Sequence, residues 1–445
     1  MRNYLYATVA MIGVVTSCEA QASVLYFDFN ANTVGQTAAA SVFLFGAPGQ
    51  AATISNLNGF SQNVVLGVDG FYNQPIANIY QQSGTGVRDT GFTIVSPDPI
   101  AGYFVNRAPF TTDMTYLQDS AALGTNYVVA SQGNGFGEGS QVAIHATQNN
   151  TAVTFTPRGG AAINVNLQAG ETYKYAGGAT DLTGSLISAD RPVAVFSGHE
   201  CAQVPSGTTF CDTLVEQMIS TDKLSKTYAV TASQGSSLAA GASDLVRVIA
   251  TADNTQVKVD GVVVATLNTG DTHEFSLNAN TGSSIEATEA VLVAQYLKGG
   301  QGNQTDPAMS VVPGLDSWLK SYHLSTPSDA QAFDLNYASI VIRTSDLGSL
   351  ELDGLPVDTS GCTAIAGTSF SRCNVSLPLG LFDLTADNPF LVMLGGGSQA
   401  DSYFTYGGAT FAPGVSPNPV PEPLTLAVLG VGLMGLGLAR RRRTA

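Results

Sequence analysis

Alternating apolar and polar positions recur along the chain and predict β-strands. Residues 256–267 are the clearest example, because the alternation runs on both sides of Asp260-Gly261, a dipeptide that favours a tight hairpin turn. Residues 172–175 and 272–277 alternate in the same way after glycine-containing turns. Residues 291–297 are instead continuously apolar, which predicts a central strand covered on both faces. The pattern as a whole predicts an all-β protein.

Three sequence markers recur with a period of roughly 95 residues and predict a repeated structural unit. The first is a short polar turn followed by an apolar run, at residues 188–196, 286–294 and 385–393 and, one residue shorter, at 96–103. The second is an apolar residue followed four positions later by a tyrosine, at Leu123/Tyr127, Leu224/Tyr228 and Trp318/Tyr322. The third is an Asp-Gly turn, at Asp260-Gly261 and Asp353-Gly354.

These markers predict about four tandem β-sandwich-like units within residues 23–410. Turn signals every ~8–12 residues indicate about seven short strands per unit, as expected for a sandwich. The expected units cover about residues 40–110, 123–205, 224–300 and 318–400. A β-propeller in which each unit supplies two blades is the alternative. Only residues 212–224 show a weak helical pattern, of a turn or two.

The N-terminus has the pattern of a signal peptide spanning residues 1–22. An apolar stretch at residues 4–15 leads to Ala20 and Ala22, the small residues that signal peptidase requires before a cut at Ser23. A lipobox, in which Cys18 would be acylated and become the first residue, is the alternative. Both patterns predict export.

The C-terminus combines three features within residues 420–445, after a linker at 411–419. They are Pro421-Glu422-Pro423, an apolar run at 424–439, and the basic cluster Arg440, Arg441, Arg442 and Arg443. As a helix the run would be roughly 24 Å long, slightly less than a membrane crossing prefers. The arginines would be held on the cytoplasmic side, so the body is expected outside, tethered by one transmembrane helix.

These three parts, in this order, resemble the PEP-CTERM sorting signal of Gram-negative bacteria. The resemblance implies that signal peptidase and a membrane-embedded exosortase process the chain. The exosortase would cut near Pro421, Glu422 and Pro423 and release or transfer the body to the cell surface or extracellular matrix. The membrane would then be a transient partner, at the inner membrane only. A permanent tail anchor is the alternative.

A second resemblance covers much of the body. Its motifs lie at residues 142–146, 150–157, 169–171, 181–184, 191–201, 204–205, 211–212 and 214–217, with a closing segment at 401–408. Together they resemble the N-terminal domain of the IgGFc-binding protein family, most closely over about residues 140–300 and loosely over 50–410. The resemblance implies a non-catalytic extracellular role in binding or scaffolding, without establishing immunoglobulin as the ligand.

The charge of the body excludes one class of partner. Without both terminal signals, 32 of the 34 acidic residues and 13 of the 18 basic residues remain, a net charge of −19. Repulsion from phosphate argues against nucleic-acid binding. Extracellular polysaccharide or surface proteins are the expected partners.

Four cysteines remain after processing and form two close pairs. Cys201 with Cys211 and Cys362 with Cys373 predict two local disulfides in an oxidising compartment. The second pair lies outside the closest family match. A zinc site is not expected, since His199-Glu200-Cys201 lacks a second pair of ligands nearby.

The histidines offer little catalytic chemistry. His199 and Glu200, beside the Cys201–Cys211 loop, are the best candidates for a binding role. His145, His273 and His323 are interpreted as ordinary strand or turn residues. The sequence has neither a nucleophile elbow nor a metalloprotease His-Glu-x-x-His motif, so we expect neither catalytic residues nor an enzyme.

We therefore favour a non-enzymatic exported protein for adhesion, matrix building or partner binding. The alternative is a carbohydrate-binding or carbohydrate-active protein acting on exopolysaccharide. Its binding platform would come from tyrosines near turns and strand ends, namely Tyr72, Tyr80, Tyr103, Tyr116, Tyr403 and Tyr406. No cofactor is expected, and calcium held by loop aspartates is the weakest of these hypotheses.

Overall fold

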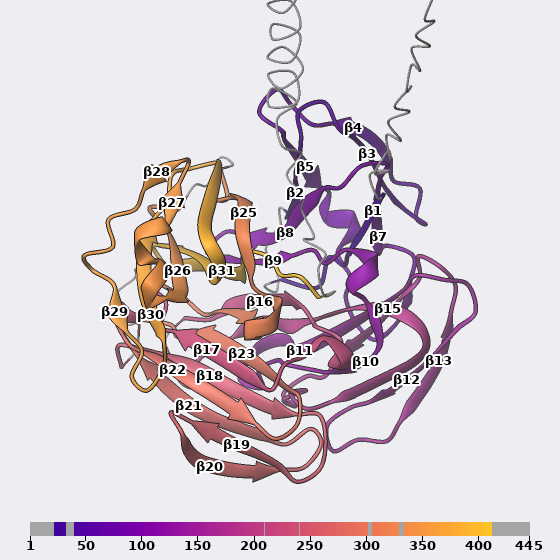
Figure 1. Cartoon of the computed structure of the whole chain (residues 1–445). Helices are drawn as coiled ribbons and strands as arrows, with labels where there is room; N and C mark the ends of the chain where they lie inside the picture. The colour runs from indigo at the N-terminus through magenta and orange to yellow at the C-terminus, as the bar shows by residue number, and fades with distance from the viewer. Residues whose placement is uncertain are drawn as a thin grey trace, which may run out of the picture.

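The computed structural model describes residues 22–32, 40–208, 210–239, 241–300, 305–328 and 333–411. These residues form antiparallel strands and short 3₁₀ turns (Figure 1). The all-β prediction is confirmed. The expected signal peptide, apart from Ala22, and the expected helix at 424–439 lie outside the described residues. Within the described ranges, no helix has the length and apolar character needed to cross a membrane.

The first unit consists of two four-stranded sheets with the orders β1-β7-β3-β4 and β5-β2-β8-β9. Its strands are β1 (Ser23–Phe27), β2 (Ala40–Phe45), β3 (Ala51–Asn56), β4 (Ser61–Val65), β5 (Phe71–Ile76), β7 (Phe92–Ser96), β8 (Ala101–Ala108) and β9 (Thr111–Tyr116). The 3₁₀ turns η1 (Asn78–Tyr80) and η2 (Ser120–Ala122) belong to its connections. Strand β6 (Gly86–Arg88) leaves this unit and pairs with β14 of the second.

The second unit repeats this order with one long strand shared by both sheets. Its strands are β10 (Gly124–Val128), β11 (Gly135–Ala146), β12 (Thr151–Thr156), β13 (Ile163–Leu167), β14 (Thr172–Ala176), β15 (Leu186–Ala202) and β16 (Asp212–Gln217). The first part of β15 pairs with β10 and β12, and its second part pairs with β11 and β16. The weak helical pattern at residues 212–224 was misleading, because β16 occupies its first half and only η3 (Thr221–Lys223) is helical. Pairing with β15 outweighs so weak a local preference.

The third and fourth units follow the same plan. The third has the sheet orders β17-β22-β19-β20 and β21-β18-β23-β24. Its elements are β17 (Thr227–Thr231), η4 (Gly235–Ser237), β18 (Ser243–Ala250), β19 (Thr255–Val259), β20 (Val262–Leu267), β21 (Thr272–Asn278), β22 (Gly282–Ala287), β23 (Val291–Leu297) and β24 (Ala308–Val311). All residues of β23 are buried, as the continuous apolar run predicted.

In the fourth unit a long strand again serves both sheets. Its elements are η5 (Leu315–Ser317), β25 (Leu319–Ser325), β26 (Leu335–Arg343), η6 (Thr344–Ser349), β27 (Glu351–Leu352), β28 (Leu355–Pro356), β29 (Thr363–Ala364), β30 (Phe370–Ser376), β31 (Leu381–Ser398) and β32 (Asp401–Tyr406). Strand β31 pairs with β25 and β27 through its first part and with β26 and β32 through its second. Within the described residues, the same pairing order therefore occurs four times.

A tyrosine hydrogen bond joins two of the repeated sequence markers. The hydroxyl of Tyr127 donates to the carbonyl of Val193 at 2.6 Å, and Tyr228 donates to Val291 at 2.6 Å. Tyr322 makes the same bond to Phe390. Each bond connects the first strand of a unit to the apolar strand that follows the polar turn. The two markers share one period because they form one contact.

The Asp-Gly marker forms a tight hairpin in both of its copies. Asp260 and Gly261 have φ of 49° and 77°, and Asp353 and Gly354 have φ of 52° and 73°. Positive φ at both central residues is the signature of a type I′ turn, which Asp and Gly tolerate better than other residues. These turns fix the register of β19 with β20 and of β27 with β28.

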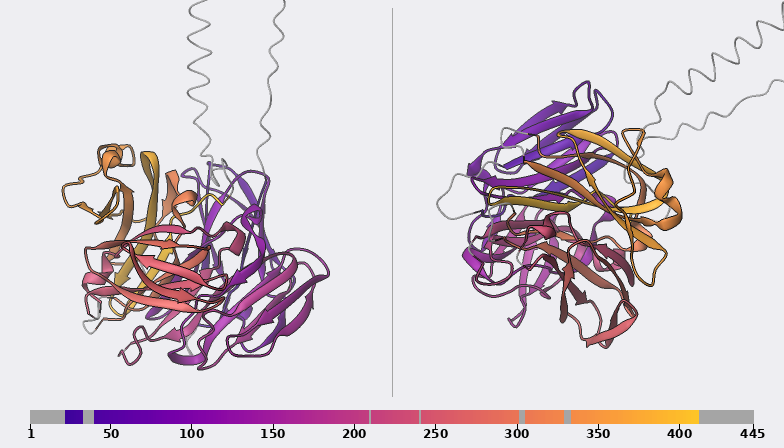
Figure 2. Two further views of the ribbon diagram at one scale, coloured as in Figure 1. Left: turned by 60° about the horizontal axis from the view of Figure 1, so that its bottom comes forward. Right: turned by 90° about the vertical axis from the view of Figure 1, so that its left-hand side faces the viewer.

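The four units form a closed ring. The last strands of the units, β9, β16, β24 and β32, each contact the next strand in this order, and β32 contacts β9. Figure 2 shows the first and fourth units side by side, and Tyr103 of β8 donates a hydrogen bond to the carbonyl of Gly407. The structural units run from 23 to 116, 124 to 217, 227 to 311 and 319 to 406, so each includes a final strand that lies at the centre.

Candidate functional site

The predicted candidate His199 lies in the interior, on β15 between β11 and β16. Its Nδ1 accepts the backbone N–H of Cys201 at 2.9 Å. Burial lowers the pKa of His199 to about 4, so the imidazole is neutral at physiological pH. This geometry fixes the ring beside the disulfide loop.

Glu200 is also buried, and it faces a second acidic residue. Its Oε2 accepts the backbone N–H of Glu138. Burial raises the pKa of Glu200, the Glu138 carboxylate raises it further, and the backbone N–H and Lys174 oppose that rise. Glu200 thus belongs to a buried polar cluster together with Glu138 and Lys174.

Lys174 on β14 is the cation of this cluster, and its side chain is fully buried. Its Nζ donates to Oε1 of Gln141 on β11, and it lies 3.9 Å from Oε2 of Glu138. Burial lowers the pKa of Lys174 to about 8, although the carboxylates of Glu138, Glu200 and Asp28 act in the opposite direction. A buried lysine was not expected on this strand, in which Lys174 stands between two tyrosines.

The cluster continues into the first unit through Asp28. Thr172 donates to Oδ1 of Asp28 at 2.6 Å, and Gln82 donates to the same oxygen at 2.9 Å. Nδ1 of His145 lies 3.5 Å from Oδ2 of Asp28. His145 is therefore a buried residue at the junction of the first two units, and it packs against Tyr26 with ring centroids 5.0 Å apart.

A second polar cluster lies at the centre of the ring, where Asp113 of β9 contacts the other three central strands. Its carboxylate accepts backbone N–H groups from Val215 of β16 at 3.0 Å, Met309 of β24 at 3.1 Å and Phe404 of β32 at 3.2 Å. A fourth N–H comes from Met114 at 2.9 Å. Burial raises the pKa of Asp113 and these four donors oppose the rise. One side chain thus joins all four units.

The neighbours of Asp113 on β9 satisfy the free edge of β16 in the same way. Thr213 donates its backbone N–H to Oγ1 of Thr111 at 2.8 Å, and Gln217 donates to Oγ1 of Thr115 at 2.8 Å. A strand edge leaves every second N–H without a partner in its own sheet. Alternating polar side chains of β9 supply those partners, so the central edges are closed inside the molecule.

Three aspartates meet at one end of the central strands. Asp212 precedes Thr213, Asp306 precedes β24, and Asp401 begins β32. Burial raises the pKa of Asp306 to about 8, and the nearby Asp401 contributes to the rise. Burial raises the pKa of Asp401 to about 7, opposed by Arg107 and by the Thr112 hydroxyl, which donates at 3.1 Å. Asp212 is raised as well, by burial and then by the other two carboxyls.

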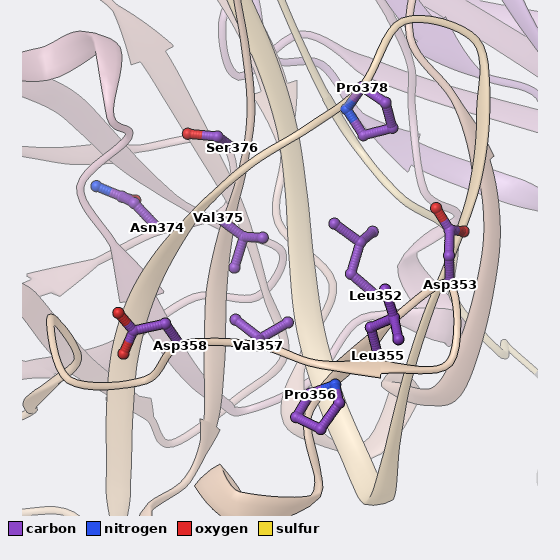
Figure 3. A pocket seen from close by; sticks show the side chains of 10 residues that line it. All are labelled: Leu352, Asp353, Leu355, Pro356, Val357, Asp358, Asn374, Val375, Ser376 and Pro378. Carbon is purple, nitrogen blue, oxygen red and sulfur yellow. The ribbon is translucent and has the colours of Figure 1, made fainter.

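An open depression of about 500 Å³ lies on the fourth unit (Figure 3). Leu352, Val357 and Val375 give it an apolar lining, and Figure 3 shows Asp353 and Asp358 on opposite sides. Asp353 accepts the backbone N–H of Asp383 at 2.8 Å, and Asp358 accepts that of Ser360 at 2.9 Å. Both carboxylates are therefore engaged in turns. Asn374, a further polar residue of the lining, accepts the hydroxyl of Ser339 at 2.9 Å.

The proposed tyrosine platform does not exist as a surface. Tyr103, Tyr116, Tyr403 and Tyr406 are buried, while Tyr72 and Tyr80 are partly exposed. Tyr116 contacts Tyr103 at 5.8 Å and Tyr406 at 5.2 Å between ring centroids. The strand ends on which these rings lie are covered by neighbouring units, which a single unit read from sequence does not reveal.

The remaining predicted residues have local roles. His323 lies 2.6 Å from Oδ1 of Asp383 through its Nδ1, and the His273 ring stacks near Phe275. Both predicted disulfides, Cys201–Cys211 and Cys362–Cys373, are formed. Over the described ranges, no group of three or more His, Cys, Asp or Glu side chains has an arrangement that could hold a metal ion.

The outer edges of several units expose apolar side chains. Strands β4, β20 and β28 each lie at the end of their sheet order. Val65 of β4, Val262 of β20 and Leu355 of β28 are 59%, 64% and 70% exposed. Val263 and Val264 are exposed beside Val262. Free strand edges that carry apolar groups are typical of surfaces that bind another chain.

Sequence reasoning missed the central carboxylates. Thr111, Asp113 and Thr115 alternate with other residues, so the segment has the pattern of a strand with one face in water. In the structure that face meets three other strands. A usable signal was the recurrence of an aspartate at or just before the start of the last strand of three units, namely Asp212, Asp306 and Asp401.

Comparison with known proteins identifies the class to which this architecture belongs. The family model described as IgGFc binding protein matches residues 113–396, which is more than half of the chain. The chain therefore belongs to the IgGFc-binding protein family. A PEP-CTERM protein-sorting motif matches residues 419–443. The family domain and the sorting motif together are those of an exported, surface-associated protein.

One relative is the human (Homo sapiens) IgGFc-binding protein. It is 26% identical over an alignment of 310 residues, which covers 66% of this chain and 6% of the human protein. The chain thus spans a small part of that protein's length.

Two solved structures of adhesion proteins align at low similarity. One is a Ca²⁺-stabilised adhesin with which an Antarctic bacterium binds ice, at 13% identity and TM-score 0.13, covering 88% of this chain and 99% of that chain. The other is a tetra-tandem repeat from the extending region of a large adhesion protein, at 14% identity and TM-score 0.11, covering 87% and 98%. TM-scores this low do not establish a shared fold.

Proposed function

We propose that this chain is a non-enzymatic surface protein for adhesion or matrix binding, which an exosortase sorts and cuts at its C-terminus. Its partners would be extracellular polysaccharide or surface proteins. The observation that carries the proposal is the set of exposed apolar residues on the free edges of β4, β20 and β28. The polar clusters of the interior hold the units together, while these edges lie on the outside.

The edge strands suggest how a partner could bind. Strand β20 offers backbone groups on its free side and the exposed side chains of Val262, Val263 and Val264. An extended segment of a partner can pair with such an edge, with backbone hydrogen bonds giving affinity and side chains giving specificity. Family membership supports a binding role of this kind, because the curated relative is named for binding.

A bead-binding assay tests this proposal. The body, residues 23–421, is coupled to fluorescent beads and incubated with matrix and surface proteins isolated from its own bacterium. A Val264→Lys variant is expected to reduce binding at least fivefold, because a lysine adds a charge to the apolar edge. Thr266→Lys is the matched control, since it adds the same charge to an exposed position of the same strand.

Two outcomes would count against the proposal. Equal binding by both variants and the wild type would exclude the β20 edge as the binding surface. Robust and selective binding on a glycan array would favour a carbohydrate-binding protein instead.

Mass spectrometry of the surface-associated form tests the sorting step. A chain that ends near Pro421-Glu422-Pro423 is expected, because the motif at residues 419–443 would be cut during sorting. A mature chain that retains Arg440 to Arg443 would overturn exosortase processing.

A further inference from the structure

We propose that Lys174 and Gln141 form an intramolecular isopeptide bond, a covalent cross-link between β14 and β11, assisted by the buried carboxyl group of Glu200. This modification is independent of the proposed binding role. The inference rests on the register of the two strands, the orientation of the Gln141 amide and the burial of the whole cluster.

The strand register brings the two side chains to the same face. Lys174 pairs with Ala143 in the antiparallel β11–β14 ladder, and Gln141 lies two residues from Ala143. Residues two apart on a strand point to the same side of a sheet, and diagonal neighbours across a ladder are within reach of long side chains. The hydrogen bond from Nζ of Lys174 to Oε1 of Gln141 shows that the amine reaches the amide group.

The amide of Gln141 is held in a fixed orientation. Its Nε2 donates to the carbonyl of Ala31, in the first unit, at 2.7 Å. Its Oε1 faces the amine of Lys174. The amide oxygen therefore contacts the nucleophile while the leaving group Nε2 is held by the backbone of the first unit, and acyl transfer depends on such fixed positions.

The surroundings of Lys174 favour a neutral amine and supply an acid. The side chain of Lys174 is fully buried, and burial lowers the pKa of its amine to about 8. Glu200 belongs to the same buried cluster, because its Oε2 accepts the backbone N–H of Glu138, whose carboxylate lies 3.9 Å from Nζ of Lys174. Burial also raises the pKa of the Glu200 carboxyl group. A buried lysine is a stronger nucleophile when neutral, and a protonated carboxyl can donate to an amide oxygen.

The reaction balances without a further reagent. The lone pair of Nζ attacks Cδ of Gln141 while the carboxyl group of Glu200 donates its proton toward Oε1. The Cδ–Nε2 bond then breaks, and Nε2 leaves as ammonia after taking a proton that Nζ has lost. Glu200 ends in its starting protonation state. The products are one amide bond between the side chains and one molecule of ammonia.

The residue pair is particular to the second unit. The strand registers identify the residues that occupy the positions of Gln141 and Lys174 in the other units. They are Ser41 and Asn73 in the first unit, Leu245 and Glu274 in the third, and Tyr337 and Asn374 in the fourth. Among the described strands, none of the other three units has a lysine beside a glutamine at these positions, so the repeated fold forms without this pair. The cross-link would join β11 to β14 beside β6, the strand that the first unit donates.

The intact mass of the purified wild-type body tests the inference. After allowance for the hydrogens lost in both disulfides, the mass is expected to be lower than the sequence mass by one ammonia. Trypsin is expected not to cut after Lys174, because its amine is blocked. The digest should contain one branched peptide that joins the segment with Gln141 to the segment with Lys174.

Two variants serve as controls. Lys174→Arg keeps the positive charge but removes the amine, so its mass should equal the sequence mass. Glu200→Gln should fold, as judged by circular dichroism, and remain at least tenfold less cross-linked than the wild type. Complete cross-linking in Glu200→Gln would overturn the role of Glu200.

Two results would contradict the cross-link itself. A wild-type body with its full sequence mass, cut by trypsin after Lys174 as readily as after Lys226, would overturn the inference. Loss of ammonia with normal cleavage after Lys174 would also overturn it, since the ammonia would then come from another residue.

Discussion

At the scale of single residues, the tyrosine that opens each of the last three units links local sequence to the repeated fold. Tyr228 accepts the backbone N–H of Ser225 at 3.0 Å and donates to the carbonyl of Val291 at 2.6 Å. The N–H belongs to Ser225, just before β17, and the carbonyl belongs to the buried strand β23. One hydroxyl therefore bonds to two buried backbone groups, one just before β17 and one at the start of β23.

Removal of this hydroxyl should destabilise the protein. We expect Tyr228→Phe to lower the free energy of unfolding by about 1–3 kcal/mol, because a buried N–H and a buried carbonyl lose their partner. Urea denaturation followed by tryptophan fluorescence measures the change. Tyr175→Phe, at a partly exposed ring in the second unit, is the matched control and should change stability by less than about 0.5 kcal/mol.

The aspartates at the end of the central strands predict a dependence of stability on pH. The folded state raises the pKa of Asp306 to about 8 and of Asp401 to about 7, whereas the unfolded chain has values near ~3.9. Between these limits the folded state binds more protons than the unfolded state, so stability falls as pH rises. The stability that the protonated Asp306 and Asp401 contribute is fully present below the unfolded pKa and is lost as pH rises through about 7–8.

Urea midpoints measured from about pH 6.5 to 8 check this. The buried neutral His199 makes stability rise with pH only below its unfolded pKa of ~6.5, where the unfolded form is protonated, so it does not affect the slope in this interval. Asp306→Asn should flatten the slope, because an amide stays neutral throughout. A wild-type midpoint that rises over this interval would contradict the assigned direction.

At the scale of elements, the last strand of each unit has an edge that the neighbouring unit satisfies. Strand β9 offers Thr111, Asp113 and Thr115 to the backbone of β16. Strand β32 offers Thr405 to the backbone N–H of Tyr116 at 3.0 Å. Side chains thus replace the main-chain pairing that would otherwise extend these sheets beyond their last strands.

Among the residues of the central strands, Asp113 is the one whose replacement should lower the stability of the protein most. We expect Asp113→Ala to lower the free energy of unfolding by roughly 3 kcal/mol or more, because backbone N–H groups of β16, β24 and β32 lose their acceptor in the interior. Asp334→Ala, at an exposed position, is the control and should be nearly neutral. Thermal and urea unfolding would show both effects, and equal stability of the two variants would contradict the role of Asp113.

The disulfide next to His199 should stabilise its loop to a limited extent. Cys201 and Cys211 are separated by 10 residues, and closing so short a loop contributes about 2–3 kcal/mol. We expect a Cys201→Ser, Cys211→Ser double variant to lose about this amount in urea denaturation. Cys362→Ser with Cys373→Ser should cost a similar amount, since its loop spans 11 residues. A much larger loss for the first pair would show that the disulfide also supports the buried Glu200 cluster.

At the scale of the whole molecule, the ring couples the four units. Their central strands contact one another in a cycle, and the first core cluster contains residues from all four units. We therefore expect one cooperative unfolding transition. Calorimetry should give a ratio of calorimetric to van't Hoff enthalpy of about 1, whereas four independent sandwiches would give a ratio near ~4.

The extent of sequence-based prediction follows from the range of each interaction. Strand alternation at residues 256–267, the Asp-Gly turns and both disulfides depend on neighbours in sequence, and the sequence indicated them correctly. The burial of Tyr103 and Tyr406 depends on units hundreds of residues apart. The same holds for Lys174, whose partners include Asp28 of another unit. These positions have ordinary strand patterns, so their roles could not be inferred locally.

By itself, the sequence determined the local chemistry of this protein: strands, turns, disulfides, a repeated unit, and a C-terminal sorting motif. Each of these depends on residues within one unit or one terminal segment. Only the tertiary structure decided that the units close into a ring, because closure depends on the free edges of β9, β16, β24 and β32 meeting one another. It likewise placed Asp113 at the common centre and Lys174 beside Gln141, since burial and proximity across strands are properties of the folded chain alone.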